Sequence, residues 1–201
     1  MGIVVGVYAL REATVARLLD DPPLMWRVLA PEDPEAYATA RAAAAAAASW
    51  LSRWFGRRRL DAVESELELA PDEAASIDFD KAWHGLHYLL NQDAWGNEPR
   101  HFLTGGGTEL SGSDAGHGPA RVLSPAQTRL ARDHVRSLSD ADLRSRFDPA
   151  EMRALKIYPD IWHRDPDKDD TLGYVMESVP PLRAFLDTAV ANGHGLLVHM
   201  S

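Results

Sequence analysis

The segment Ile77–Leu90 limits the fold of this chain more than any other part of the sequence. Within it, Trp83, Leu86 and Leu90 recur at intervals of three and four residues. This spacing places their side chains on one face of an α-helix and gives that helix an apolar stripe. An amphipathic helix must bury its apolar stripe against other elements. We therefore expect this segment to form a central scaffold helix with these three residues in the core.

A second set of side chains on the same segment could carry chemistry. Asp80, His84 and His87 lie three or four residues apart, so a helix places them one turn from one another. Such a set could hold a metal ion. However, the zinc-protease pattern needs two histidines four residues apart with a glutamate between them, which is not found here. The alternative is that His87 packs in the core with hydrogen-bonded nitrogens, while Asp80 favours the helix N-terminus. We prefer the packing interpretation and predict no metal site and no cofactor.

The charge and cysteine content exclude several classes of function. The 201 residues include 21 basic and 30 acidic side chains, for a formal net charge of −9. A general nucleic-acid binder needs a cationic surface, so no nucleic-acid partner is predicted. The chain has no cysteine, which excludes disulfides, thiolate catalysis and thiolate metal ligands. Any site must therefore use other polar side chains.

The N-terminal region indicates the expected compartment. Met1–Tyr8 has no basic residue ahead of its apolar run, which is unlike a signal peptide. No apolar run approaches the roughly 20 residues that a membrane span requires. We therefore expect a cytoplasmic protein that does not engage a membrane.

The order of the expected elements indicates the fold class. Strands are expected at Ile3–Leu10, Val63–Leu69 and Leu196–Val198. Helices are expected at Arg11–Leu19, from Glu35 to about Arg58, in the Asp80 segment, after Ser124, Ser139 and Asp148, and over Leu182–Val190. These few strands are scattered among helices. The sequence thus predicts an α+β fold, a single compact domain over residues 1–201 with several helices packed around few strands.

Two further segments contribute candidate site residues. Gln92–Ala120 is rich in glycine and is expected to be a long loop. It has neither the Gly-Lys-Ser/Thr ending of a phosphate loop nor a dinucleotide-binding glycine pattern, so a turn or lid is preferred, with Trp95 and His117 as candidates. The segment from Tyr158 to Asp165 mixes aromatic and titratable groups. Tyr158 and Trp162 could line a pocket or pack on the domain, and both alternatives stay open.

Several segments in order resemble one family. They are Met1-Gly2, Asp80–Leu90, Gly105-Gly106 with Gly112–Arg121, Arg146–Pro149 and Ile157–Trp162. This combination is similar to the YfbM-like family of uncharacterised bacterial proteins, a domain of unknown function. The resemblance implies a single compact α+β domain and supplies no catalytic residue. Residues from about 36 to 60 carry no family motif and are interpreted as a lineage-specific helical expansion.

Two functions from different classes fit these observations. The preferred one is a cytosolic, non-enzymatic binding or regulatory module that engages a protein partner. The alternative is a small hydrolase or transferase with a His/Asp site between the Asp80 helix, the glycine-rich loop and the Tyr158–Asp165 segment. Histidines directed into a shared pocket would favour the enzyme, and histidines hydrogen-bonded in a solid interior would favour the binding module. The candidate pocket residues are Asp80, His84, His87, Trp95, His117, Tyr158 and Trp162.

Overall fold

The computed structural model describes residues 2–55, 67–114 and 116–201. The strands are β1 (Val5–Arg11), β2 (Ser76–Asp78), β3 (Thr108–Asp114), β4 (Pro119–Leu123) and β5 (His194–Met200). The α-helices are α1 (Glu12–Asp20), α2 (Trp26–Leu29), α3 (Pro34–Phe55), α4 (Trp83–Asn91), α5 (Pro125–Ser137), α6 (Asp140–Ser145), α7 (Pro149–Ala154), α8 (Thr171–Met176) and α9 (Val179–Ala191). Short 3₁₀ helices are η1 (Pro22–Met25), η2 (Asp80–Ala82) and η3 (Pro99–His101).

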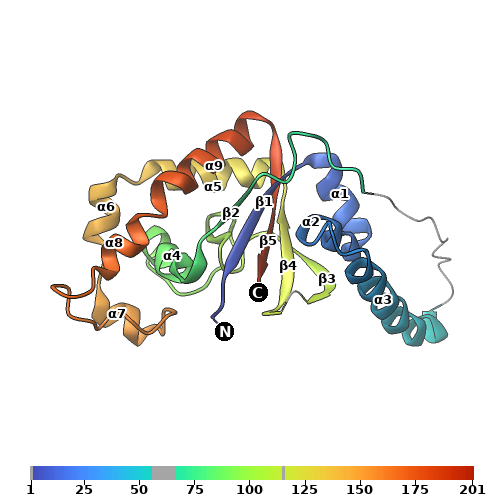
Figure 1. Ribbon diagram of the computed structural model, residues 1–201, viewed down its shortest axis with the longest axis horizontal. Coiled ribbons are helices and arrows are strands. Elements are labelled where there is room, and N and C mark those ends of the chain that lie inside the picture. Colours follow the sequence, from blue (N-terminus) through green and yellow to red (C-terminus); the bar gives the residue numbers. More distant parts are fainter. Residues whose placement is uncertain (1, 56–66, 115) are drawn as a thin grey trace.

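One antiparallel sheet lies at the centre of the described chain, with the strand order β2-β1-β5-β4-β3. The two strands nearest the ends of the sequence, β1 and β5, pair over seven residues from Val5↔Met200 to Arg11↔His194. Helices α4 to α9 lie on one side of the sheet and α1 to α3 lie on the other (Figure 1). The predicted α+β class is therefore confirmed.

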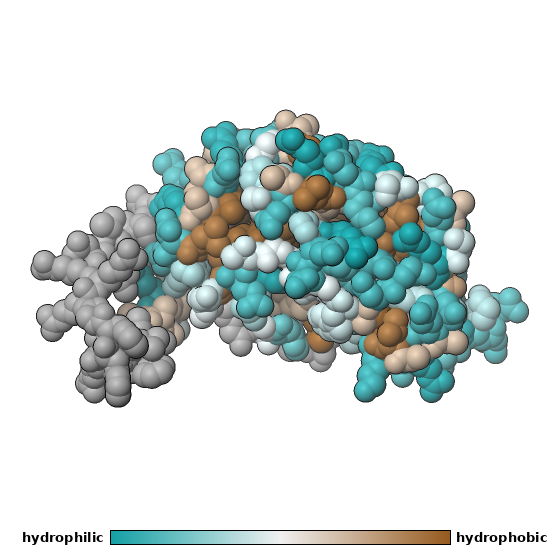
Figure 2. Space-filling model, turned by 180° about the vertical axis from the view of Figure 1, so that it is seen from behind, coloured by the Kyte–Doolittle hydropathy of each residue, from teal (hydrophilic) through white to brown (hydrophobic). Residues whose placement is uncertain are grey.

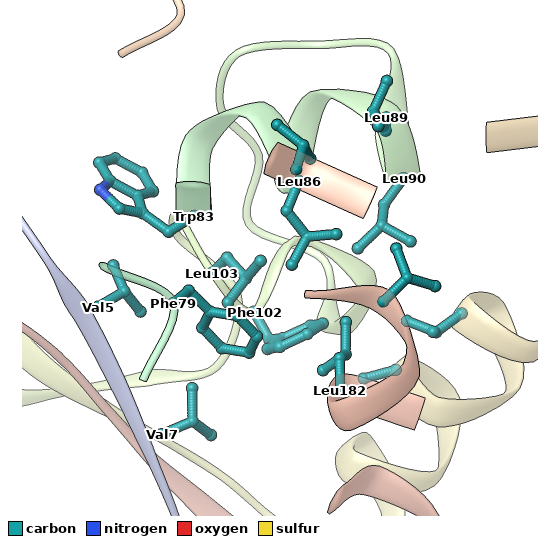
Figure 3. Close-up of a cluster of buried hydrophobic side chains, with 14 of the residues drawn as sticks. Val5, Val7, Phe79, Trp83, Leu86, Leu89, Leu90, Phe102, Leu103 and Leu182 are labelled. Carbon is teal, nitrogen blue, oxygen red and sulfur yellow. The ribbon is translucent and has the colours of Figure 1, made fainter. Parts of the chain in front are cut away.

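The larger core lies between the sheet and α4, α5 and α9. Val5 and Val7 of β1 face side chains from α4, the 102–103 segment and α9 (Figure 3). Trp83, Leu86 and Leu90 are each at most 1% exposed. The apolar stripe of the Asp80 segment is thus buried as predicted, and α4 is a central scaffold helix. The helix is shorter than expected, because Ile77 belongs to β2 and Asp80 belongs to η2 rather than to α4.

A smaller core covers the opposite face of the sheet. It joins Leu10, Val122 and Leu197 to side chains of α1 and η1, including Leu18 and Met25. Neighbouring residues of β5 belong to different cores, Leu196 to the larger and Leu197 to the smaller. This follows from the two-residue period of a strand, which directs successive side chains to opposite faces. The sheet is therefore buried on both sides.

Three helix starts follow the capping chemistry expected from the sequence. At α5 the Ser124 hydroxyl accepts the Gln127 N–H, and the Gln127 side chain accepts the Ser124 N–H. The Ser139 cap of α6 has the same reciprocal form, and the Asp148 side chain accepts two N–H groups at α7. Each cap satisfies backbone donors that the helix itself leaves free.

The structure corrects the prediction of a continuous loop over Gln92–Ala120. Its second half forms the β3–β4 hairpin, and Gly112, Gly116 and Gly118 adopt positive φ angles within or beside it. The glycines therefore mark turns in a hairpin. Similarly, residues 67–69 of the expected Val63–Leu69 strand form no regular element, and residues 63–66 lie outside the described part. The last residues of the helix expected to end near Arg58 lie outside it too.

Apolar side chains reach the surface in separate places. Figure 2 shows a face on which hydrophilic residues predominate and hydrophobic groups form several distinct patches. Among the residues whose exposure is described, Trp95 and Leu130 are the most exposed large hydrophobic ones, at 60% and 59%. Within residues 2–55, 67–114 and 116–201, no helix is both long enough and apolar enough to cross a membrane.

Candidate functional site

Helix α4 places both of its histidines inside the protein rather than at its surface. The His84 ring stacks on Trp83 with 4.6 Å between ring centroids. Its Nδ1 accepts the backbone N–H of Tyr158 at 3.0 Å, so Nε2 carries the proton and donates to the carbonyl of Ala94 at 2.8 Å. Both nitrogens are therefore occupied, and His84 ties α4 to two loops that are distant in sequence.

His87 belongs to a second network, centred on Asp93. Its Nε2 donates to Asp93 Oδ1 at 2.8 Å, and His101 Nε2 donates to Asp93 Oδ2 at 3.0 Å. His101 Nδ1 accepts the backbone N–H of Glu98 at 3.2 Å. One carboxylate thus bridges two imidazoles and fixes the segment after α4 against η3. Sequence reasoning did not identify Asp93 or His101, because their proximity to His87 depends on how this segment turns back.

The C-terminal end of α4 is held by side chains from the following helices. Arg146 donates to the carbonyls of Leu89 and Leu90 at 3.1 and 2.7 Å, and His134 Nε2 donates to the Leu90 carbonyl at 3.0 Å. Carbonyls in the last turn of a helix have no partner within the helix. These donors satisfy two of them and orient the His87 end of α4.

Burial controls the acid–base properties of the histidines on α4. Desolvation lowers the pKa of His84 and outweighs the opposing hydrogen bond to Ala94. Desolvation also lowers the pKa of His87 to about 4, although the hydrogen bond and charge of Asp93 act in the opposite direction. Both imidazoles are therefore neutral near pH 7, which agrees with the hydrogen-bond pattern.

This arrangement predicts a loss of stability in mild acid. The pKa of His87 is lower in the folded state than its ordinary value of 6.5, so the unfolded chain binds more protons as the pH falls from 6.5 towards 4. We expect this group alone to remove about 2 kcal/mol of unfolding free energy between pH 7.5 and pH 5. Urea titrations across this range measure the effect. His87→Gln should flatten the profile and His163→Gln, at an exposed position, should not; a flat wild-type profile would contradict the assignment.

Three of the predicted site residues lie away from the His87–Asp93 network. Asp80 is exposed and accepts a hydrogen bond from the Tyr174 hydroxyl at 3.3 Å. Trp162 is buried, lies close to Gly85 and donates to the Ile157 carbonyl at 2.7 Å. Tyr158 lines a separate cavity of about 310 Å³ with Arg153 and Lys156. The structure therefore does not bring all the candidates into one pocket.

The other two candidates do meet in one place. A cleft of about 150 Å³ lies between the glycine-rich loop, the β3–β4 hairpin and the end of β5. Its walls include Trp95, Thr104, Glu109, His117, Arg121 and Met200. We call it the Trp95 cleft. Both Trp95 and His117 were candidates from the glycine-rich segment, and the hairpin that brings them together was not predicted.

Arg121 gives the Trp95 cleft its unusual electrostatic character. Its side chain is on β4 and only 5% of the residue is exposed. Its guanidinium donates to the Gly106 carbonyl at 3.1 Å, and desolvation lowers its pKa to about 10, so it stays charged near pH 7. Glu109 faces it across the β3–β4 pair. The sequence alone did not predict that the positively charged Arg121 would be buried in the wall of this cleft.

The histidine network lies behind the cleft without forming its wall. The ring centroids of Trp95 and His84 lie 5.0 Å apart, and Thr104 Oγ1 lies 3.4 Å from His87 Nδ1. His87 itself is 0% exposed. Hence the two α4 histidines support the cleft from within the core. In the described ranges, no group of three or more histidine, aspartate or glutamate residues is arranged to hold a metal ion, and the absence of tight metal binding stays a prediction.

The fold is that of a small α+β domain, and comparison with known proteins gives its family. The chain belongs to the family described as Domain of unknown function (DUF1877), which matches residues 1–199. The structure is similar to the crystal structure of a protein of unknown function, YfbM, from Escherichia coli, with a TM-score of 0.61 and 14% sequence identity. The similarity covers 98% of this chain and 99% of that one, and at this identity it shows the fold alone. No curated protein matches the chain.

Proposed function

We propose that this protein is a non-enzymatic binding module that engages a protein partner through the Trp95 cleft. One observation carries the proposal: a tryptophan that is 60% exposed stands beside a cleft with a buried arginine in its wall. Tryptophan and arginine are enriched among the residues that dominate the energy of protein–protein interfaces. We propose the cytoplasm as the compartment of this module.

The size of the cleft supports a protein partner over a metabolite. Pockets for small molecules and cofactors usually enclose about 300–1,000 Å³, whereas the Trp95 cleft measures about 150 Å³. This volume suits one side chain of a partner. The remaining binding energy would come from the surrounding surface, with the Trp95 indole covered on association.

The alternative hydrolase is less well supported by the same geometry. Asp93, His87 and Thr104 form a carboxylate–imidazole–hydroxyl series, in which His87 Nδ1 lies 3.4 Å from the Thr104 hydroxyl. A general base works best with a pKa near the working pH, but burial lowers the pKa of His87 to about 4. The Thr104 hydroxyl also donates to the His101 carbonyl at 3.2 Å. These features favour a structural role for the series.

Site-specific photo-crosslinking tests the proposed function. A photo-reactive amino acid at Asn97, which is exposed and two residues from Trp95, should yield a discrete crosslinked protein in cells of the source organism. The same group at Leu130, an exposed position on α5, should not yield that product. Adding Trp95→Ala to the Asn97 variant should remove it. Equal crosslinking with and without Trp95 would contradict the proposal.

A further inference from the structure

We infer that the Trp95 cleft binds an acidic side chain, aspartate or glutamate, of its partner through the guanidinium of Arg121. This inference rests on the proposed binding function and adds the chemical class of the group that is recognised. It is carried by the burial of Arg121, by the one hydrogen-bond partner that its side chain has among the described residues, and by the apolar surfaces beside it.

The charge of Arg121 is largely removed from water. A guanidinium has five N–H donors, and removal of a charge from water is costly unless it is paired. Across the ranges that the structure describes, the Arg121 side chain makes one hydrogen bond, to the Gly106 carbonyl, and no ion pair within 4.0 Å. Because the residue is only 5% exposed, few positions remain from which an anion could reach it. The cleft is one of them.

The geometry of the guanidinium group restricts the shape of the anion that fits it. Guanidinium and carboxylate groups match in a planar arrangement with two parallel hydrogen bonds. A carboxylate at the end of a short side chain needs room for its own oxygens and a few methylene groups, which a cleft of about 150 Å³ provides. The apolar groups of Trp95, Pro119 and Met200 also line the cleft. They offer contact surface to the methylene groups of an acidic side chain.

Glu109 is the other charged residue that lines the cleft. It pairs with Arg121 across β3 and β4, yet its side chain is exposed and forms no ion pair with the guanidinium. Glu109 therefore leaves the donors of Arg121 free while adding a negative charge nearby. An incoming carboxylate would be repelled by it, whereas an incoming lysine or arginine would be attracted. The effect of removing this charge thus separates the two classes of ligand.

The experiment uses short blocked peptides and the full chain. Backbone and side-chain amide signals of ¹⁵N-labelled protein are followed by NMR as acetyl-Gly-Glu-Gly-amide is added at constant ionic strength. We expect saturable shifts at Gly105, Gly106, the Trp95 indole and the Arg121 side chain. Acetyl-Gly-Gln-Gly-amide should produce shifts at least tenfold weaker. Acetyl-Gly-Gly-Gly with a free C-terminus tests whether the cleft recognises a C-terminal carboxylate instead of an acidic side chain. Inorganic phosphate tests whether the cleft binds anions in general.

Two variants and one control variant sharpen the result. Arg121→Met should abolish the shifts caused by the glutamate peptide, and Arg100→Met, at an arginine outside the cleft, should preserve them. Glu109→Gln should strengthen binding by about two- to fivefold, because it removes a like charge at an exposed position beside the guanidinium. This second variant keeps the test valid even if Arg121→Met fails to fold.

Several outcomes would overturn the inference. They are the absence of shifts at the cleft, equal binding of the glutamine peptide, stronger binding of the free C-terminus or of phosphate, and weaker binding in Glu109→Gln. Failure here is distinct from failure of the proposed function. Trp95-dependent crosslinking without binding of the glutamate peptide would support the proposed binding function. It would show that only the assignment of an acidic side chain as the recognised group is wrong.

Discussion

Replacing Trp83 with alanine is expected to lower the free energy of unfolding by about 3–5 kcal/mol, as deletion of a buried aromatic side chain does. Trp83 is 1% exposed, and its indole N–H donates to the carbonyl of Ile3 at 3.0 Å. The centroid of its ring lies 4.6 Å from that of His84 and 6.1 Å from that of Tyr158. The variant therefore loses apolar burial, a hydrogen bond and ring contacts that join α4 to the N-terminal segment and to the 158 loop.

Urea titration at 25 °C and pH 7.5 measures this effect. Leu130→Ala is the matched control, because Leu130 is a large apolar side chain on an exposed helical face, and surface substitutions usually change stability by no more than about 0.5 kcal/mol. A loss below about 1 kcal/mol for Trp83→Ala would show that α4 is peripheral and would contradict the central position assigned to it.

The helical core was predictable because its signals are local. The spacing of Trp83, Leu86 and Leu90 specifies a buried face without reference to any other segment. The capping groups at Ser124 and Asp148 likewise act on backbone amides only two or three residues away. The spacing of apolar residues and the capping residues can therefore be recognised in a single sequence, and the structure confirms both.

The parts that were not predicted depend on distant pairing. The short strand β2 has only three residues and pairs with β1 across about 70 positions of sequence, which no local pattern specifies. The glycines of the β3–β4 hairpin resembled loop glycines, because a turn with positive φ and a flexible loop use the same residue. Helix α8 was also not predicted.

The candidate site was only partly predictable for the same reason. The sequence identified His84 and His87 as unusual residues and preferred a packing role for them, which the hydrogen bonds to Ala94 and Asp93 support. It also singled out Trp95 and His117. However, Arg121 acquires its importance from its burial beside Gly106, which depends on the register of β4 and on the path of the glycine-rich loop.

The second large effect is expected on binding rather than on stability. Trp95 is 60% exposed and contacts the ring of His84, so Trp95→Ala should leave the fold intact while removing the largest apolar contact of the cleft. Central tryptophans of protein interfaces commonly contribute 2 kcal/mol or more. We expect Trp95→Ala to weaken binding of the crosslinked partner by about 100-fold, close to 3 kcal/mol.

The measurement that tests the central claim most directly is the calorimetric affinity of that partner for the wild-type protein, Trp95→Ala and Leu130→Ala. Circular dichroism and urea titration establish first that all three are folded at the same temperature. Recognition through the Trp95 cleft predicts a loss of about 100-fold for Trp95→Ala and a change of less than threefold for Leu130→Ala. Affinity that is unchanged in Trp95→Ala, or lost equally in both variants, would contradict it.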